Sequence, residues 1–359
     1  MAPGDQLVSQ AVAQAIVAGS QEGRSKQMVD NAALAETWRK YRGWTARARA
    51  VRASLDYWRL LVLQLTVAGA VFATLASQLP VWFSNTDRIG VVARVLSALS
   101  AAAMALAAYS GRSILDPTAE RQWLRARALG ESCKSECYRF AARVPPYEGA
   151  DAGPKLLNRL QQLLASGADV PAMEIDDADA VNGLPPYPLS VQDYIALRLR
   201  DQIDSFYRPK AAQNEHKAAL YAHWGQGLSA LAAILGSVGA IWGGSYFEAW
   251  VAVAGTIAAA IGSYALGQRF QRLAATYRVT ADRLAVRLAL WEVTAAAQPD
   301  PAADRALVLD AEGIMAAENE AWLAEFLRDP TAPAQASGKL NVAPAEQDHS
   351  REMASSDRK

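Results

Sequence analysis

The feature that most constrains this chain is a set of almost uncharged stretches, each about as long as a membrane-spanning helix. A helix of about 20 residues rises far enough to cross a hydrocarbon core of about 30 Å. A helix on the surface of a soluble protein keeps a charged face, whereas Arg94 is the single charged residue within these stretches. We therefore predict an all-α integral membrane protein with four spans, at about residues 60–79, 89–110, 224–244 and 249–267.

Basic residues indicate which side of the membrane each segment faces. They are dense before the first span, after the second, before the third and after the fourth, but the short turns within each pair carry only Arg88. Because positively charged flanks stay in the cytoplasm, we predict a multi-pass protein of the cell (inner) membrane with both termini cytoplasmic. Residues 1–27 agree with this topology, since they lack the basic start and compact apolar core of a cleaved signal peptide.

The chain also repeats a pattern of residues around each pair of spans. Tyr41 precedes Trp58 by the same interval that separates Tyr207 from Trp224. A Thr-Ala-acid-Arg run follows each pair of spans, at 118–121 and again later in the chain. Such internal similarity is typical of a duplicated structural unit. We predict two tandem helical hairpins, each extended into the cytoplasm by long helices.

The segments between these modules differ from them in composition. The connecting segment is rich in Pro and Asp, and we expect it to hold a short amphipathic helix at 155–164 and one strand near 170–175. The C-terminal tail is polar and poor in aromatic residues, which is typical of disorder. The predicted organisation is a polar N-terminal segment 1–30, a first module 31–143, a cytoplasmic linker 144–189, a second module 190–329 and a disordered tail 330–359.

Overall composition excludes several classes of function. The chain has 36 Lys and Arg against 36 Asp and Glu, so it lacks the positive charge of a general nucleic-acid binder. Two Cys and three His are too few for a disulfide scaffold or an ordinary zinc site. We find no pairing of a nucleophile with a base and no metal-ligand pattern, so we expect no cofactor and no enzymatic activity.

Polar residues on the first span are the candidates for a pore. Gln64, Thr74 and Gln78 fall on one side of a helix, and such a stripe in lipid either bonds to a neighbouring helix or faces water. Arg94 lies near one end of the second span, where its side chain can extend to the headgroups.

Small residues on the third and fourth spans permit close helix packing in lipid. They form ladders that serve either the packing of one hairpin or the packing of neighbouring protomers. The candidate positions are Gly236, Gly239, Gly243, Gly255 and Gly262.

Two further groups of residues have ordinary structural interpretations. Cys133 and Cys137 lie four residues apart and share a helix face, where we expect small buried side chains, with a metal or redox pair as the alternative. Arg198 and Lys210 mix with acidic residues on one helix, and we expect a solvated face there, with a ligand or inter-subunit role as the alternative.

The residues around the second module resemble a known family. The helix that leads into the third span and the last helix of the chain carry Arg198, Asp201, Gln202, Tyr207, Lys210, Asn214 and Trp322. This order is similar to that of SLATT domains, the two-transmembrane effector domains associated with SMODS nucleotidyltransferases and SLOG proteins. The helix after the second span is similar to a first SLATT type, although Tyr138 stands where that type has Trp. The resemblance covers about residues 31–327.

The resemblance implies a membrane effector of bacterial conflict or anti-phage systems, which breaches the inner membrane when a sensor signals infection. We find no Gly-rich phosphate loop beside a strand, so a sensor or nucleotide-signalling partner is expected to be a separate protein encoded nearby. The favoured interpretation is a homo-oligomeric pore in the lipid bilayer, since the spans hold no ATP motif and no chain of acidic or His residues that a pump would need. The alternative is a membrane-tethered scaffold that recruits a cytoplasmic partner without conducting ions.

Overall fold

The structure is a computed structural model that describes residues 3–83, 87–113, 117–242, 245–297 and 300–327. Within these ranges the regular elements are all helices, which confirms the all-α prediction. In chain order they are α1 (Pro3–Trp82), α2 (Asp87–Ser113), α3 (Pro117–Ala141), α4 (Ala152–Ser166), α5 (Asp177–Ala180), α6 (Val191–Tyr194), the π-helix η1 (Ile195–Tyr207), α7 (Arg208–Trp242), α8 (Ser245–Gln268), α9 (Phe270–Ala297) and α10 (Pro301–Leu327).

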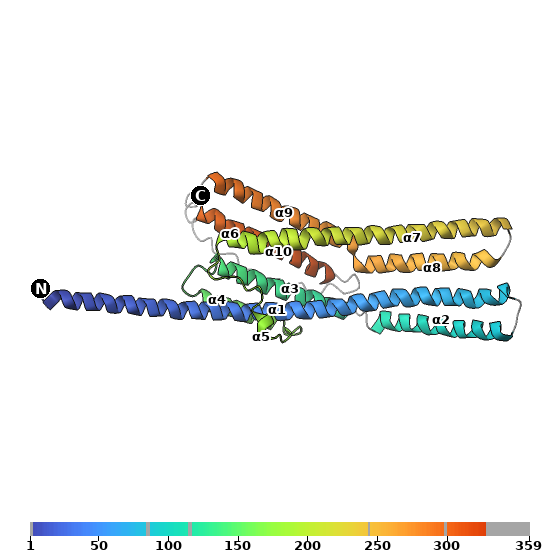
Figure 1. Ribbon diagram of the computed structural model, residues 1–359, viewed down its shortest axis with the longest axis horizontal. Helices are drawn as coiled ribbons and strands as arrows, with labels where there is room; N and C mark the ends of the chain where they lie inside the picture. The colour runs from blue at the N-terminus through green and yellow to red at the C-terminus, as the bar shows by residue number, and fades with distance from the viewer. Residues whose placement is uncertain (1–2, 84–86, 114–116, 243–244, 298–299, 328–359) are drawn as a thin grey trace, which may run out of the picture.

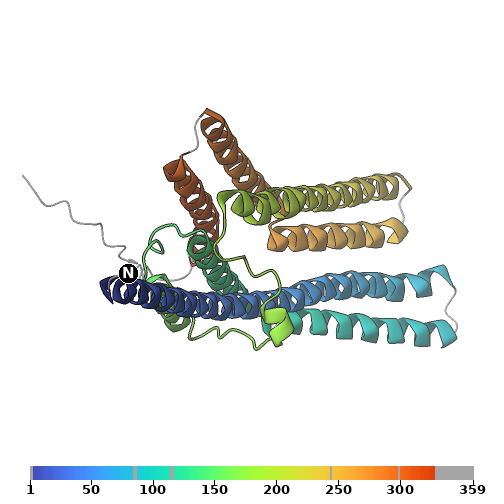
Figure 2. The same cartoon turned by 60° about the vertical axis from the view of Figure 1, so that its left-hand side comes forward.

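Four helical stretches are long and apolar enough to cross a membrane. They are α1, α2, the stretch that ends in α7, and the stretch that begins in α8 and extends into α9. The most apolar window of each helix is only 6% to 17% buried within the chain, so its side chains face outward. α2 packs against the second half of α1, and α8 packs against α7. Figures 1 and 2 show both helix pairs on one side of the molecule, with the C-terminal ends of α1 and α7 at the same end.

The remaining helices form a helical body at the opposite end, in which α3, α4, α9 and α10 gather beside the first half of α1 and the start of α7 (Figure 1). Large apolar side chains are buried together there, with Trp44 of α1 and Phe140 of α3 fully inside. Leu199 of η1, Leu284 of α9 and Leu307 of α10 complete the same core. α1 runs without a break from this body into the apolar half, so a single helix connects the two regions.

Residues 144–189, which we expected to act as a linker, pack into this core. Its α4 lies against α1 and α3 and buries Leu156. The hydroxyl of Tyr147 donates to Glu136 of α3 at 2.8 Å. The amide of Leu189 donates to the carbonyl of Ala141 at 2.8 Å, which brings the two ends of the segment together. The connection is therefore a folded part of the helical body.

The predicted strand near 170–175 is wrong. The backbone groups of this segment bond to α1 instead of to a neighbouring strand. The indole of Trp44 donates to the carbonyl of Val170 at 2.8 Å, and the amide of Met173 donates to the carbonyl of Gly43 at 3.3 Å. Helix α1 thus supplies the hydrogen bonds that a second strand would have supplied.

The π-helix η1 explains how the start of the second module buries its residues. Buried side chains recur every fourth residue, at Ile195, Leu199, Ile203 and Tyr207. In an α-helix with 3.6 residues per turn this spacing would drift around the axis. The wider turn of a π-helix, with hydrogen bonds from i to i+5, keeps the four side chains closer to one line.

Helix α8 ends at a sharp break before α9. Arg269 has a φ of 54°, in the left-handed region that residues with a side chain seldom occupy. The amide of Arg269 still donates to the carbonyls of Ala265 and Leu266, so the last turn of α8 is closed before the chain changes direction. The break directs α9 away from the apolar helix pair and into the helical body.

Candidate functional site

The polar stripe expected on the first span is divided by the fold. Gln64 is exposed, whereas Thr74 and Gln78 are buried. Gln78 lies one helical turn before Trp82, whose ring stacks on Trp250 of α8 at 6.3 Å and 5°. This side of α1 therefore faces the second helix pair.

Other polar atoms lie along the contact between α1 and α2. The hydroxyl of Ser100 donates to the carbonyl of Gly69 at 2.7 Å, which ties the two helices together. The hydroxyl of Ser110 and the Oε1 atom of Gln78 are buried without a hydrogen-bond partner among the described residues. In hydrocarbon such unsatisfied groups are costly. The apolar half of the protein thus holds four separate buried polar side chains, Thr74, Gln78, Ser100 and Ser110, here called the polar seam. Gln78 and Ser110, near opposite ends of the α1 and α2 pair, have a buried polar atom without a partner among the described residues.

Arg94 lies in the second turn of α2, close to the connecting turn. Its side chain is exposed, and its Nε donates to the carbonyl of Gly90 at 3.2 Å. The structure therefore places Arg94 on an exposed side of α2 near the end of a span, whereas Thr74 and Gln78 are buried.

The small residues of α7 and α8 have two different surroundings. A methyl group on Gly239 would lie 3.4 Å from Phe247, and one on Gly236 would lie 3.9 Å from Val251, so the helices are close at these positions. A methyl group on Gly255 or Gly262 would meet nothing within 4 Å. Gly243 lies outside the described residues. The two helices are thus close near the C-terminal end of α7 and farther apart toward the helical body.

A buried ion pair joins η1 to α10 in the helical body. Arg198 donates through Nε and Nη2 to the two oxygens of Glu312, at 2.9 and 3.0 Å. The two side chains are 1% and 2% exposed, and the hydroxyl of Tyr194 donates to the same carboxylate at 3.0 Å. Burial alone disfavours the charge on Arg198, but attraction to Glu312 outweighs it and raises the pKa of the guanidinium well above its ordinary value.

A second ion pair joins α3 to α10. The Nη2 of Arg127 donates to both oxygens of Glu318, at 3.0 and 3.2 Å. Its Nη1 lies 3.4 Å from the hydroxyl of Tyr277 in α9. Burial opposes the charge on Arg127, but nearby Tyr277 and Glu318 raise its pKa. Helix α10 is therefore held by two arginines, one from each module.

Lys134 and the two cysteines lie on α3 between these ion pairs and α1. The ammonium of Lys134 lies 5.6 Å from the ring centre of Tyr41. Burial and the charge of Arg198 lower the pKa of Lys134 to about 8. Cys133 and Cys137 are buried, as predicted, and burial raises the pKa of both thiols, which disfavours the reactive thiolate.

The residues that suggested the family occupy both faces of η1 and the start of α7. Gln202 and Tyr207 are buried in the body with Arg198, so the expected solvated face is wrong for Arg198, because its partner on α10 covers it. Asp201 and Lys210 are exposed. Two remaining positions are Asn214, which donates to the carbonyl of Lys210 at 2.7 Å, and Trp322, whose side chain lies outside the described residues.

Sequence reasoning missed the acidic partners on α10. Glu312 and Glu318 are buried at positions that continue the apolar pattern of Leu307, Ala311 and Met315. Helical periodicity places these five residues on the side of α10 that faces the core. A carboxylate in line with buried apolar residues signals a buried cation elsewhere, because an unpaired charge is seldom buried.

Two different family models match separate parts of the chain. Residues 194–322 match the SMODS and SLOG-associating 2TM effector domain 1. This match runs from the end of α6 to α10 and supports the SLATT family, as the resemblance implied. Residues 42–155 match a different model, a family of unknown function termed DUF4231. Neither a curated protein nor a solved structure matches the chain.

Proposed function

We propose that this protein is a multi-pass membrane effector of a bacterial conflict or anti-phage system that breaches the inner membrane as a homo-oligomer. The coarser part of this statement, a membrane effector, follows from the SLATT match and the four apolar helices. The observation that supports a homo-oligomer that breaches the membrane is the polar seam. Its unsatisfied Gln78 and Ser110 lie among helices whose other surfaces suit lipid.

The polar seam connects oligomerisation to conduction. A buried polar atom without a partner costs free energy in hydrocarbon, so the chain is stabilised when a neighbouring helix or water reaches that atom. A neighbouring protomer supplies such a helix, and a pore supplies the water. Gln64 lies on the same helix but is exposed, so its side chain is accessible to a neighbouring protomer or to water.

The cytoplasmic body is suited to keep this assembly inactive until a signal arrives. Helix α10 bonds to Arg198 of the second module and to Arg127 of the first. A partner or nucleotide signal that separates α10 from these arginines would uncouple the two helix pairs. Both modules have a long helix that leads into the membrane and an exit helix packed against it, α1 with α3 and α7 with α9, which supports a tandem origin.

The test is depolarisation of cells that express the full chain with its neighbouring genes, followed with a potential-sensitive dye during phage infection. We expect depolarisation after infection, and a smaller signal for Gln78→Leu and for Gln64→Leu. The matched control is Thr66→Val, because the Thr66 hydroxyl already donates to the carbonyl of Val62 in its own helix at 2.8 Å. A membrane that stays polarised under every trigger, with the protein inserted, would contradict the pore.

One observation favours the scaffold as a second candidate. Val279, Val286, Leu290 and Val293 are exposed along one side of α9, outside the apolar window, at a spacing typical of helix partners. A cytoplasmic helix could pack on this face without any ion flow. Loss of a stoichiometric partner in Val286→Asp, together with an electrically silent membrane, would favour the scaffold.

A further inference from the structure

Helix α9 carries apolar residues on two faces. The inner face buries Leu284 and Leu288 in the core of the helical body. The outer face leaves Val279, Val286 and Val293 exposed by 56%, 60% and 74%, although the side of a surface helix opposite its buried face is normally polar. Figures 1 and 2 show α9 at the edge of the helical body away from α1, and the part of the chain that the structure describes leaves these three side chains uncovered.

The outer face of α9 follows the repeat of a coiled coil. Its residues are separated by alternate steps of four and three, and a mean step of 3.5 keeps one side of a helix in line with a partner helix. Valine recurs at every seventh position, which is typical of two parallel helices. The face consists of Ala275, Val279, Asp282, Val286, Ala289 and Val293, all of them exposed.

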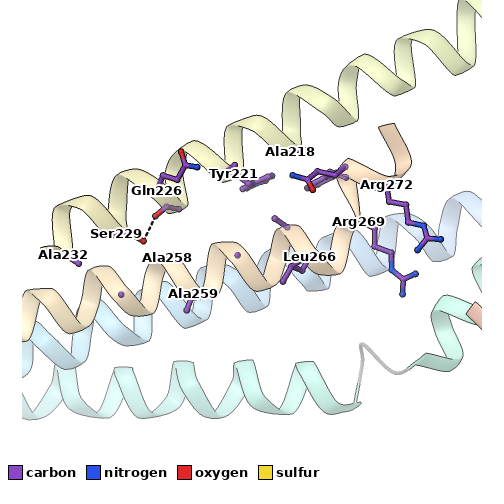
Figure 3. Close-up of a pocket in the computed structure, with 17 residues that line it drawn as sticks. Ala218, Tyr221, Gln226, Ser229, Ala232, Ala258, Ala259, Leu266, Arg269 and Arg272 are labelled. Carbon is purple, nitrogen blue, oxygen red and sulfur yellow. Dashed lines mark hydrogen bonds between the residues drawn. The ribbon is translucent and has the colours of Figure 1, made fainter. Parts of the chain in front are cut away.

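The direction of α9 is fixed at its membrane end. Phe270, the first residue of α9, stacks on Tyr221 of α7 with the ring centres 5.6 Å apart and an interplanar angle of 3°. Figure 3 shows this end of the helix, where Arg269 and Arg272 lie at one end of a groove of about 1230 Å³ between α7 and α8. Both arginines already make interactions, so their charge is not left for a ligand of the groove. Because α9 leads from the apolar helix pair into the helical body, two copies inserted in one membrane present parallel α9 helices.

The charges on α9 favour a second copy of this chain over an unrelated helix. Three of them are compensated within the chain, since Arg278, Arg287 and Glu292 bond to oppositely charged residues of α7, α10 and η1. Asp282 and Arg283 are exposed and form no ion pair among the described residues. In a parallel two-fold contact, residues of the same number lie at the same level, so Asp282 of each copy lies beside Arg283 of the partner subunit. The outer face is thus complementary to itself.

The length of the outer face suits a contact that forms within a membrane. From Ala275 to Val293 it rises about 27 Å at 1.5 Å per residue, which is about two and a half heptads. This is shorter than the roughly three to four heptads typical of a free-standing coiled coil. Confinement of two copies to one membrane raises their effective concentration and compensates for a short contact.

We infer that the outer face of α9 is a contact between two copies of this chain, which pack in parallel around a two-fold axis along the membrane normal. The inference rests on the homo-oligomer and the membrane placement proposed above, and it names the surface through which the copies meet. Helix α9 also packs on α10, so the contact lies beside the helix that joins the two modules.

The test is disulfide cross-linking of the full chain in the membranes of cells that express it. The native Cys133 and Cys137 are buried and contribute little background. Val286→Cys lies opposite its counterpart in the proposed contact, so we expect it to form a covalent dimer under mild oxidation at least about ten-fold faster than Val181→Cys. Val181 is the matched control, because it is 55% exposed and lies outside α9.

Exchange of the two unpaired charges tests whether the partner is a second copy. In the Val286→Cys background, Asp282→Arg and Arg283→Asp each place like charges opposite one another, so we expect each to slow cross-linking by about ten-fold. The variant with both substitutions restores complementarity between identical copies and should restore the rate. An unrelated partner would not recover its binding when the two charges are exchanged.

Three results would overturn the contact. The first is cross-linking of Val286→Cys that is no faster than that of Val181→Cys or is unchanged by either single charge variant. The second is a covalent product with a different protein, which would assign the outer face to a scaffold partner. The third is preferential formation of mixed dimers between Val279→Cys and Val293→Cys copies, because parallel helices bring each position to itself.

Depolarisation measured in the same cells separates this inference from the proposed function. Dimers that obey the charge exchange in a membrane that stays polarised would support the contact and contradict the pore. Depolarisation without dimers would contradict the contact alone. Absence of the protein from the membrane fraction would overturn both.

Discussion

Buried charges in the helical body depend on their partners for stability. Arg198 and Glu312 are 1% and 2% exposed, and the two hydrogen bonds between them compensate for the loss of water. Removal of one partner leaves the other charged and unpaired in a region of low dielectric constant. Replacement of both removes the desolvation cost together with the attraction.

The Arg198 and Glu312 pair therefore predicts a large coupling between two substitutions. We expect Arg198→Met and Glu312→Leu each to lower the free energy of unfolding by about 3–5 kcal/mol. The double variant should recover most of this loss. The measurement is denaturant unfolding of the detergent-solubilised protein. If the two losses of unfolding free energy simply add in the double variant, Arg198 and Glu312 do not stabilise the fold as a pair.

Lys134 predicts a pH dependence of stability. Its pKa in the folded protein is about 8, below the ordinary 10.5, so the fold favours the neutral amine. The destabilisation is fully present below pH 8 and is relieved as the pH rises to 10.5. We expect Lys134→Met to stabilise the protein by about 1–3 kcal/mol at pH 7, with the gain shrinking between pH 8 and 10.5 in melting curves. A gain that is constant across this range would show that the ammonium is not the cause.

At the scale of helices, local patterns predicted more than long-range ones. Hydropathy and the absence of charge are properties of consecutive residues, so the four apolar helices could be predicted from the sequence. The pairing of Arg198 with Glu312 joins positions 114 residues apart, and no periodicity within either helix indicates the partner. The same holds for Val170, which lies against Trp44.

The contact of α1 with α2 depends on one glycine. A methyl group on Gly69 would lie 2.8 Å from the sulfur of Met104, whereas one on Gly111 would meet nothing within 4 Å. We expect Gly69→Leu to destabilise the protein by about 1–3 kcal/mol through overpacking. Gly111→Leu is the matched control and should be nearly neutral in the same thermal melt. Equal effects would show that the two helices do not pack as described.

At the scale of the whole molecule, the protein divides into an apolar end and a charged end. α1 and α7 run through both ends, and α10 joins the modules within the charged end through Arg127 and Arg198. In the proposed mechanism, a displacement of α10 would reach the apolar end indirectly, through α3 and α9, which pack on α1 and α7. The central claim in this account is that lipid surrounds the apolar end and that both turns lie outside the cell.

Labelling of single cysteines in intact cells with a membrane-impermeant maleimide tests that claim most directly. Phe83 is exposed beside the first turn and Glu174 is exposed in the cytoplasmic body, while the native Cys133 and Cys137 are buried and serve as an unreactive background. We predict that Phe83→Cys reacts in intact cells and that Glu174→Cys reacts only after the membrane is permeabilised. Equal labelling of both positions in intact cells, or recovery of the protein in the soluble fraction, would contradict the account.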